Sequence, residues 1–100
     1  MELSKFELIR DWAYKRNIIL GSDIKSQLCK LGEEFGEVCA AIARGNKEAL
    51  KDGIGDMVVV LTILAEQSHM SIEECINSAW EEIKDRKGKM VNGVFIKEGE

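Results

Sequence analysis

IKSQLCKLGEEFGEVCAAI, residues 24–42, is the stretch that decides the fold of this chain. Its large apolar residues recur at intervals of four, three, four, three and four positions, at Ile24, Leu28, Leu31, Phe35, Val38 and Ile42. This spacing places an apolar stripe along one face of an α-helix, and such a face must pack against another element. Gly21-Ser22-Asp23 supplies a break and an N-cap before this helix, and Gly45 supplies its end.

Three further helices are predicted, over residues 4–17, from Asn46 to about Gln67, and from 72 to near Gly88. The last of these begins at Ser71-Ile72-Glu73-Glu74, which matches a capping box. Val91-Asn92-Gly93-Val94-Phe95 then predicts a tight hairpin with short arms. Four helices with short connections indicate an all-α fold, a four-helix bundle-like unit with a short irregular or hairpin C-terminal tail.

The third predicted helix is apolar around nearly its whole circumference from Ile54 onwards. A helix of this kind is buried on all sides, and one domain of 100 residues cannot easily enclose it. We therefore expect it to lie at a subunit interface of a homo-oligomer, either a dimer or a tetramer. Val58-Val59-Val60 would also suit a β-strand, but the helical context and the length of the segment favour a helix.

The composition indicates one soluble domain over residues 1–100. Hydrophobic residues make up 45% and charged residues 32% of the chain, as in globular proteins, and the net charge of -4 argues against nucleic-acid binding. No apolar run is long enough to cross a membrane, and no signal-peptide pattern is present. Cys29, Cys39 and Cys75 are odd in number and lie in amphipathic patterns, which favours reduced cysteines and a cytoplasmic location.

Two groups of carboxylates are candidates for a functional site. Glu33, Glu34 and Glu37 lie close together on the helix of residues 24–44, while Asp52 and Asp56 are one turn apart on the next helix. We expect Asp56 to point into a packed region. An acidic run on a helix is ordinarily a solvated face, but carboxylates aimed at an apolar interior are costly unless a cation is bound. Mg²⁺ is the natural candidate because it prefers oxygen ligands, and Mn²⁺ is a second possibility.

Glu34-x-x-Glu37, followed by a Gly-Asp-apolar segment at Asp56, resembles the MazG-type all-α nucleoside triphosphate pyrophosphohydrolases. The similarity runs from about Leu28 to Glu66, and the ending from Glu82 to Met90 resembles that of short phage-type members. The pattern of that family has glutamate three residues before its aspartate, where this chain has Gly53. Asp52, on nearly the same helix face, is the candidate replacement, with a water bridging its shorter side chain to the metal.

The resemblance implies Mg²⁺-dependent hydrolysis of (deoxy)nucleoside triphosphates to the monophosphate and pyrophosphate, which removes unwanted nucleotides. Glu34, Glu37, Asp56 and Asp52 would bind the metal, and Glu33 or Glu34 would orient or deprotonate the attacking water. Candidate substrate contacts are Lys30, Asn77, Arg86, Lys87 and Lys89. Cations near a helix C-terminus can also simply complement its dipole, and Lys30 can be an ion-pair partner of the nearby glutamates.

Aromatic residues offer a weaker signal. Trp12 is a candidate for stacking on a base, whereas Phe35 and Trp80 lie in apolar stripes and are expected in the core. Two other functions stay open. One is a phosphoribosyl-ATP pyrophosphohydrolase-like activity, and the other is a non-catalytic helical dimerisation or regulatory module with a degenerate metal site, which Gly53 keeps open.

Overall fold

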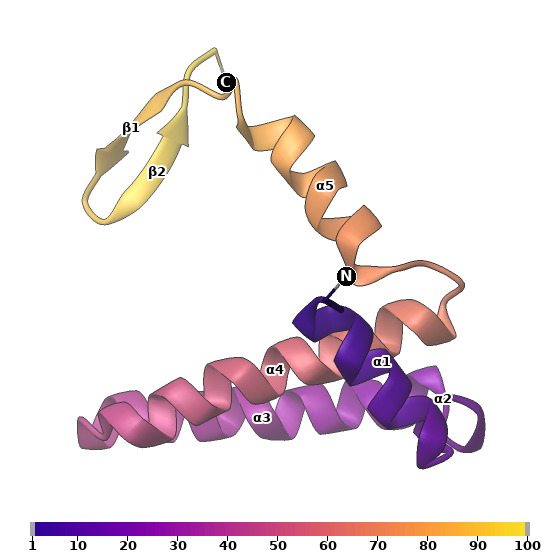
Figure 1. The fold of residues 1–100 in the computed structure, drawn as a ribbon. Helices are drawn as coiled ribbons and strands as arrows, with labels where there is room; N and C mark the ends of the chain where they lie inside the picture. Colours follow the sequence, from indigo (N-terminus) through magenta and orange to yellow (C-terminus); the bar gives the residue numbers. More distant parts are fainter. Residues whose placement is uncertain (1, 100) are drawn as a thin grey trace.

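The computed structural model describes residues 2–99, which fold mainly into helices with one small sheet (Figure 1). The elements are α1 (Lys5–Lys15), α2 (Ile18–Gly21), α3 (Ile24–Arg44), α4 (Lys47–Gln67), α5 (Ile72–Ile83), β1 (Gly88–Val91) and β2 (Val94–Lys97). The predicted helical class is therefore confirmed. The short helix α2 was not expected, because four residues are too few to show a helical pattern.

Side-chain caps fix where the long helices begin. The side chain of each N-cap accepts a hydrogen bond from the backbone N–H three residues later, at Ser4, Asp23, Asn46 and Ser71. Gly45 ends α3 with a left-handed φ of 64°, which costs a residue without Cβ very little. The predicted bounds of α3 and α4 are thus confirmed. The predicted end of the last helix is wrong, because α5 stops at Ile83 and Gly88 already pairs in β1.

The antiparallel pair α3–α4 forms the long body of the molecule (Figure 1). Gly53 is buried where the two helices meet, and a Cβ at this position would lie 2.8 Å from Cγ2 of Val38. Glycine at this position therefore lets the two helices approach closely without crowding Val38. At one end of the pair, α1 and α2 pack on α4 around a small core of Ala13, Ile19 and Ile63.

The segment of residues 72–97, which we call the C-terminal arm, leads away from this body (Figure 1). It consists of α5 and the antiparallel hairpin β1–β2, in which Val91 lies opposite Val94. The two turn residues, Asn92 and Gly93, have φ values of 50° and 80°, as a type I′ turn requires. The predicted hairpin is therefore confirmed.

Few apolar side chains are buried in the single chain. Phe35 and Trp80 are 56% and 55% exposed, so the prediction that both lie in the core is wrong for one chain. Neither the α3–α4 pair nor the C-terminal arm covers these two side chains. On α4, Ile54 is also 53% exposed, so a single chain does not enclose this helix. Within residues 2–99 no helix is both long and apolar enough to cross a membrane.

Candidate metal centre

Three of the predicted carboxylates come together on the α3–α4 pair. Glu34, Glu37 and Asp56 each place one carboxylate oxygen within 4.8 Å of the oxygens of the other two. Glu34 and Glu37 are neighbours on one face of α3 because residues three apart lie on adjacent turns. Asp56 reaches them from α4, which runs antiparallel beside α3. The group therefore depends on the packing of the two helices.

Glu34 is the buried member of this acidic group, with 6% of the residue exposed. Its Oε1 lies 3.3 Å from Nζ of Lys30. Its Oε2 is buried and has no hydrogen-bond partner among the described residues. A buried carboxylate oxygen without a donor is costly, and a divalent cation bound there would offset that cost. Three convergent carboxylates are also the ligand type that Mg²⁺ prefers, so the residues fit such an ion.

The charges of this group act on one another. The negative charge of Glu34 raises the pKa of Glu37, and Asp56 adds to the effect while Lys30 opposes it. The hydrogen bond from Lys30 to Glu34 in turn raises the pKa of Lys30. Carboxylates held this close repel when ionised, and a cation between them would relieve the repulsion.

Asp56 is exposed, so the prediction that it points into a packed region is wrong for the single chain. Its neighbours along the same face of α4, Val59 and Ile63, are the residues that pack at the small core under α1 and α2. The helices α1 and α2, which cover Val59 and Ile63, end before they reach Asp56. This exposure leaves the carboxylate accessible to a metal or a substrate.

A cavity of about 400 Å³ adjoins the acidic group between the end of α3 and the start of α4. Asp52 lines it together with Glu37 and Asp56, although Asp52 is not one of the three residues whose oxygens converge. Arg44 also lines this cavity, and it was not among the site residues predicted from the sequence. The spacing in the sequence could have identified Arg44, because it lies seven residues, or about two helical turns, after Glu37 on the same helix. A guanidinium at this position can pair with phosphate oxygens.

A second hollow, of about 380 Å³, adjoins Lys30 on the other side. It is mostly apolar, and its lining residues are Trp12, Ile18, Ser26, Gln27, Lys30, Val59, Val60 and Ile63. Trp12 comes from α1 and keeps 43% of its surface exposed. The structure thus places an aromatic ring and Lys30, the ion-pair partner of Glu34, at the same hollow.

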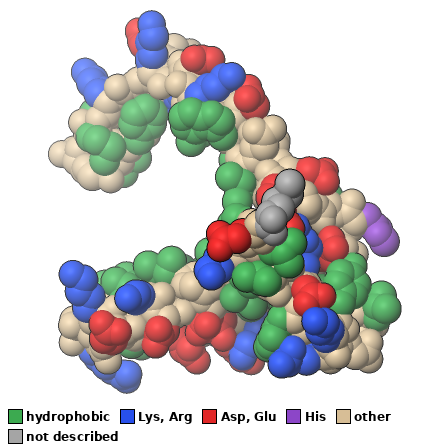
Figure 2. Space-filling model, in the orientation of Figure 1, with side chains coloured by type: hydrophobic (Ala, Val, Ile, Leu, Met, Phe, Trp, Pro, Cys, Tyr) green, Lys and Arg blue, Asp and Glu red, His purple; other side chains and the backbone are tan. Residues whose placement is uncertain are grey.

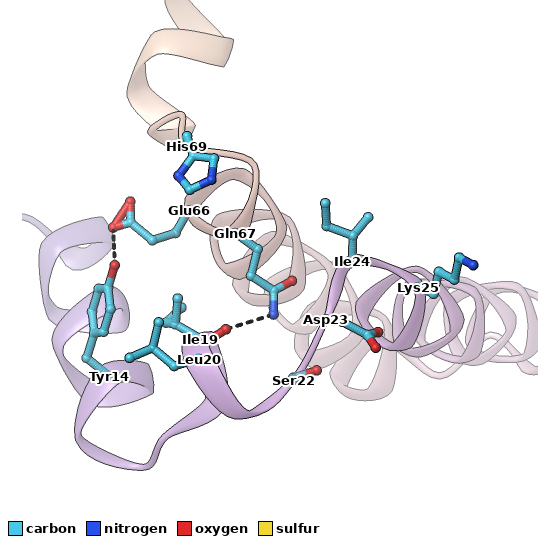
Figure 3. Close-up of a pocket in the computed structure, with 10 residues that line it drawn as sticks. All are labelled: Tyr14, Ile19, Leu20, Ser22, Asp23, Ile24, Lys25, Glu66, Gln67 and His69. Atoms are coloured by element: carbon cyan, nitrogen blue, oxygen red, sulfur yellow. Dashed lines mark hydrogen bonds between the residues drawn. The ribbon is translucent and has the colours of Figure 1, made fainter.

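A larger cavity, of about 610 Å³, lies between α1, α2, the start of α3 and the end of α4 (Figure 3). Tyr14 donates a hydrogen bond of 3.1 Å to Glu66 there, and Gln67 donates one of 3.2 Å to the carbonyl of Ile19. These contacts tie α1 and α2 to the last turns of α4. None of the three clustered carboxylates lines this cavity, so it is separate from the acidic group.

The remaining predicted site residues lie at the edge of the group or outside it. Glu33 is exposed, and its Oε2 lies 3.8 Å from Nζ of Lys30. Asn77 lies on α5, Arg86 and Lys87 follow that helix, and Lys89 lies in β1. Figure 1 shows the arm that carries these four residues leading away from the α3–α4 pair. Within one chain the structure therefore does not bring them to the acidic group.

Comparisons with known proteins bear on this site. Residues 23–91 match the family model of the MazG nucleotide pyrophosphohydrolase domain, and this range contains all three clustered carboxylates. Over 62 residues the chain is 45% identical to a protein of Haemophilus phage HP1 (strain HP1c1), named an uncharacterized 18.2 kDa protein in the rep-hol intergenic region. The match covers 62% of this chain but only 38% of the length of the phage protein. No solved structure shows significant similarity to the chain.

Proposed function

Because the chain belongs to the MazG nucleotide pyrophosphohydrolase family, we propose that it hydrolyses (deoxy)nucleoside triphosphates to the monophosphate and pyrophosphate. The observation that carries this proposal is the unpartnered buried oxygen of Glu34 beside Glu37 and Asp56. A bound cation would offset the cost of this oxygen, and Mg²⁺ suits the role because it prefers oxygen ligands, those of carboxylates and phosphates included. The proposed purpose is the removal of unwanted or surplus nucleotides.

In this proposal Glu34, Glu37 and Asp56 hold the Mg²⁺, and Asp52 contributes through a bridging water from the wall of the same cavity. The bound ion would neutralise phosphate oxygens at the linkage between the α- and β-phosphates. Water adds to the α-phosphorus, the bond to the bridging oxygen breaks, and pyrophosphate leaves. Glu33 suits the task of orienting this water and accepting its proton, because its carboxylate is exposed whereas Glu34 is buried.

The two hollows beside the acidic group suggest how the substrate is held. Lys30 and Arg44 lie on opposite sides of the group along α3, where each can pair with phosphate oxygens. Trp12 offers a ring face for the base in the apolar hollow that Lys30 borders. We further propose that the enzyme is a homo-oligomer. Asn77, Arg86, Lys87 and Lys89 are substrate contacts only if another copy brings them to the site.

A competing function is a non-catalytic module that binds a metal, and Gly53 is the observation that favours it. In the pattern of the family this position carries glutamate, whereas here it is glycine in contact with Val38. A protein with one carboxylate fewer can still bind Mg²⁺ but lose turnover. The phosphoribosyl-ATP pyrophosphohydrolase reaction would use the same carboxylates to bind the metal. Phosphoribosyl-ATP is therefore included among the substrates to be assayed.

The test is to incubate the protein and Mg²⁺ with each ribo- and deoxynucleoside triphosphate, and with phosphoribosyl-ATP, and to measure pyrophosphate and monophosphate. We expect at least one substrate to give both products in equal amounts. Glu37→Gln and Asp56→Asn should abolish turnover while the circular dichroism spectrum stays helical. Glu48→Gln, an exposed acid at the start of α4, is the matched control and should keep full activity. A folded protein that binds Mg²⁺ but releases no pyrophosphate from any substrate would instead support the non-catalytic module.

A further inference from the structure

The cavity of about 400 Å³ beside the acidic group carries different polar groups at its two ends. Glu37 and Asp56, two of the three clustered carboxylates, line one end. Arg44, the last residue of α3, and Asn46, the N-cap of α4, line the other end. Since a helix rises about 1.5 Å per residue, Arg44 lies about 10 Å beyond Glu37 along α3. The cavity thus runs from the candidate metal position towards a group of hydrogen-bond donors.

The donors at the far end of this cavity are available to a ligand. Among residues 2–99 the guanidinium of Arg44 forms no ion pair. Asn46 accepts a 3.1 Å hydrogen bond from the N–H of Ala49 with its side-chain oxygen, which leaves its amide nitrogen without an acceptor among the described residues. The start of α4 adds the partial positive charge of a helix N-terminus. A guanidinium, an amide and a helix N-terminus together suit phosphate oxygens.

Small residues leave room for a ligand between the two ends. Ala40 and Ala41 of α3 and Ala49 and Gly53 of α4 line the walls of the cavity. Its volume falls within the range of small-molecule sites, about 300–1,000 Å³. Figure 2 shows basic and acidic side chains clustered at the end of the pair where α3 passes into α4. A charged ligand therefore suits this cavity better than an apolar one.

The hollow on the opposite side of the acidic group has the other chemistry. It is mostly apolar, and Trp12 lines it together with Lys30. A nucleobase can stack on an aromatic ring in such a hollow, whereas ionised phosphates would lose their hydration there. A nucleotide whose base lies at Trp12 directs its phosphates past the acidic group, towards Arg44.

We propose that the cavity of Arg44 and Asn46 is the subsite for the β- and γ-phosphates, and thus for the pyrophosphate that leaves. This assignment rests on the proposed hydrolysis and gives the substrate a direction, with its base at Trp12 and its α-phosphate at the acidic group. The bond that breaks joins the α-phosphorus to the oxygen that pyrophosphate carries away. Arg44 pairs with the terminal phosphate, so the site selects triphosphates over diphosphates. The carboxylates in the same cavity repel pyrophosphate, so pyrophosphate binding requires a divalent cation that offsets their charge.

The first test is isothermal titration calorimetry of the full chain with magnesium pyrophosphate, and with sodium pyrophosphate in EDTA. We expect the wild type to bind only the magnesium complex. Arg44→Gln should raise the dissociation constant about tenfold or more, and Arg44→Lys should give an intermediate value because it keeps the charge but loses the two-point contact. Lys51→Gln is the matched control for net charge, since Lys51 is exposed on α4 and does not line the cavity, and it should bind as the wild type does.

A second titration tests the direction of the substrate. Deoxynucleoside monophosphates lack the terminal phosphates, so with Mg²⁺ they should bind equally well to the wild type and to Arg44→Gln. Trp12→Ala should weaken the binding of the monophosphate with the highest affinity and leave magnesium pyrophosphate binding unchanged. Trp12→Leu replaces this variant if circular dichroism shows a loss of helicity. A folded Arg44→Gln that loses monophosphate binding but keeps pyrophosphate binding would overturn the proposal. A wild type that does not bind magnesium pyrophosphate would also overturn it.

These titrations separate the subsite from the proposed reaction, because pyrophosphate binding needs no turnover. Pyrophosphate binding that depends on Arg44, in a protein that hydrolyses no substrate, would retain the subsite and refute the proposed hydrolysis. Turnover in a protein whose pyrophosphate binding does not depend on Arg44 would refute the subsite alone. With an active enzyme, Arg44→Gln should raise the KM of the triphosphate about tenfold and leave the KM of the corresponding diphosphate unchanged. An equal rise for both substrates would contradict a contact with the terminal phosphate.

Discussion

A Cβ atom on Gly53 would lie 2.8 Å from Cγ2 of Val38, so α3 and α4 touch at the position where the MazG-type pattern has glutamate. Valine is branched at Cβ and stiff in a helix, so its methyl group cannot easily move away. A side chain at position 53 would first meet α3. The absence of glutamate at position 53 is thus linked to the close packing of α3 and α4, the two helices that carry the acidic group.

Gly53→Ala should destabilise the protein by about 1–3 kcal/mol, because overpacking at Val38 outweighs the gain of up to about 1 kcal/mol in helix propensity. The measurement is urea unfolding followed by circular dichroism. Gly55→Ala on the same helix is the control, because its added Cβ would contact nothing within 4 Å, and it should stabilise the protein. Adding Val38→Ala to Gly53→Ala should recover part of the loss. Equal stabilisation by both alanines would contradict the close contact.

Mg²⁺ should stabilise the wild-type protein by about 2.7 kcal/mol at a concentration 100 times its dissociation constant. Glu34→Gln should abolish this effect, because it removes the charge from the buried oxygen that lacks a donor. In the absence of Mg²⁺ the variant should be no less stable than the wild type, since repulsion of Glu37 is also removed. Thermal unfolding with and without Mg²⁺ measures both effects. A Mg²⁺ response that survives in Glu34→Gln would place the metal elsewhere.

Lys30→Gln should separate metal binding from nucleotide binding. Nζ of Lys30 lies 3.3 Å from Glu34 and competes electrostatically with a cation, so Mg²⁺ alone should bind at least as tightly to the variant. If Lys30 also contacts the triphosphate, the KM of the substrate should rise by about tenfold, the equivalent of 1.4 kcal/mol. Isothermal titration calorimetry and initial rates give the two values. Weaker Mg²⁺ binding with an unchanged KM would refute both assignments.

Asp52→Ala should weaken Mg²⁺ binding less than Asp56→Asn does. Asp52 lines the same cavity, but its carboxylate does not converge with the other three, so its contact would pass through a water. The Mg²⁺ dissociation constants of the two variants, measured by calorimetry, test this prediction. An unchanged dissociation constant in Asp52→Ala would remove Asp52 from the metal site.

The contact between Arg10 and Glu73 should make stability depend on pH. The hydrogen bond from Arg10 lowers the pKa of Glu73, so the contact stabilises the folded state above the ordinary pKa of a glutamate and is lost as pH falls through the lowered value. At pH 7 Glu73→Gln should therefore unfold at a lower temperature than the wild type. The difference should shrink below about pH 4.3. Thermal unfolding from pH 7 to pH 3 tests this, and a difference that stays constant would show that the charge of Glu73 plays no part.

Local structure followed from short stretches of sequence. Asp23 and Gly45 bound α3, and Asn92-Gly93 forms the turn of the hairpin, as predicted. Each of these signals works through hydrogen bonds or φ preferences within a few residues, so neighbours in the sequence are sufficient to determine it. The early end of α5 was missed because competition between a helix and a hairpin involves pairing with Lys97, nine residues beyond Gly88.

The sequence by itself determined the helical fold, the types of residue that can bind a metal, and the carboxylates worth testing. Only the tertiary structure decided that Glu34 is buried beside Lys30 while Asp56 stays exposed. It also decided that Phe35 and Trp80 lie on open surfaces and that Arg44 borders the acidic cavity. The physical reason is that burial and charge proximity depend on where separate helices cross. A periodic apolar pattern in the sequence shows that one face of a helix must be covered. The way in which the helices cross decides which residues cover that face.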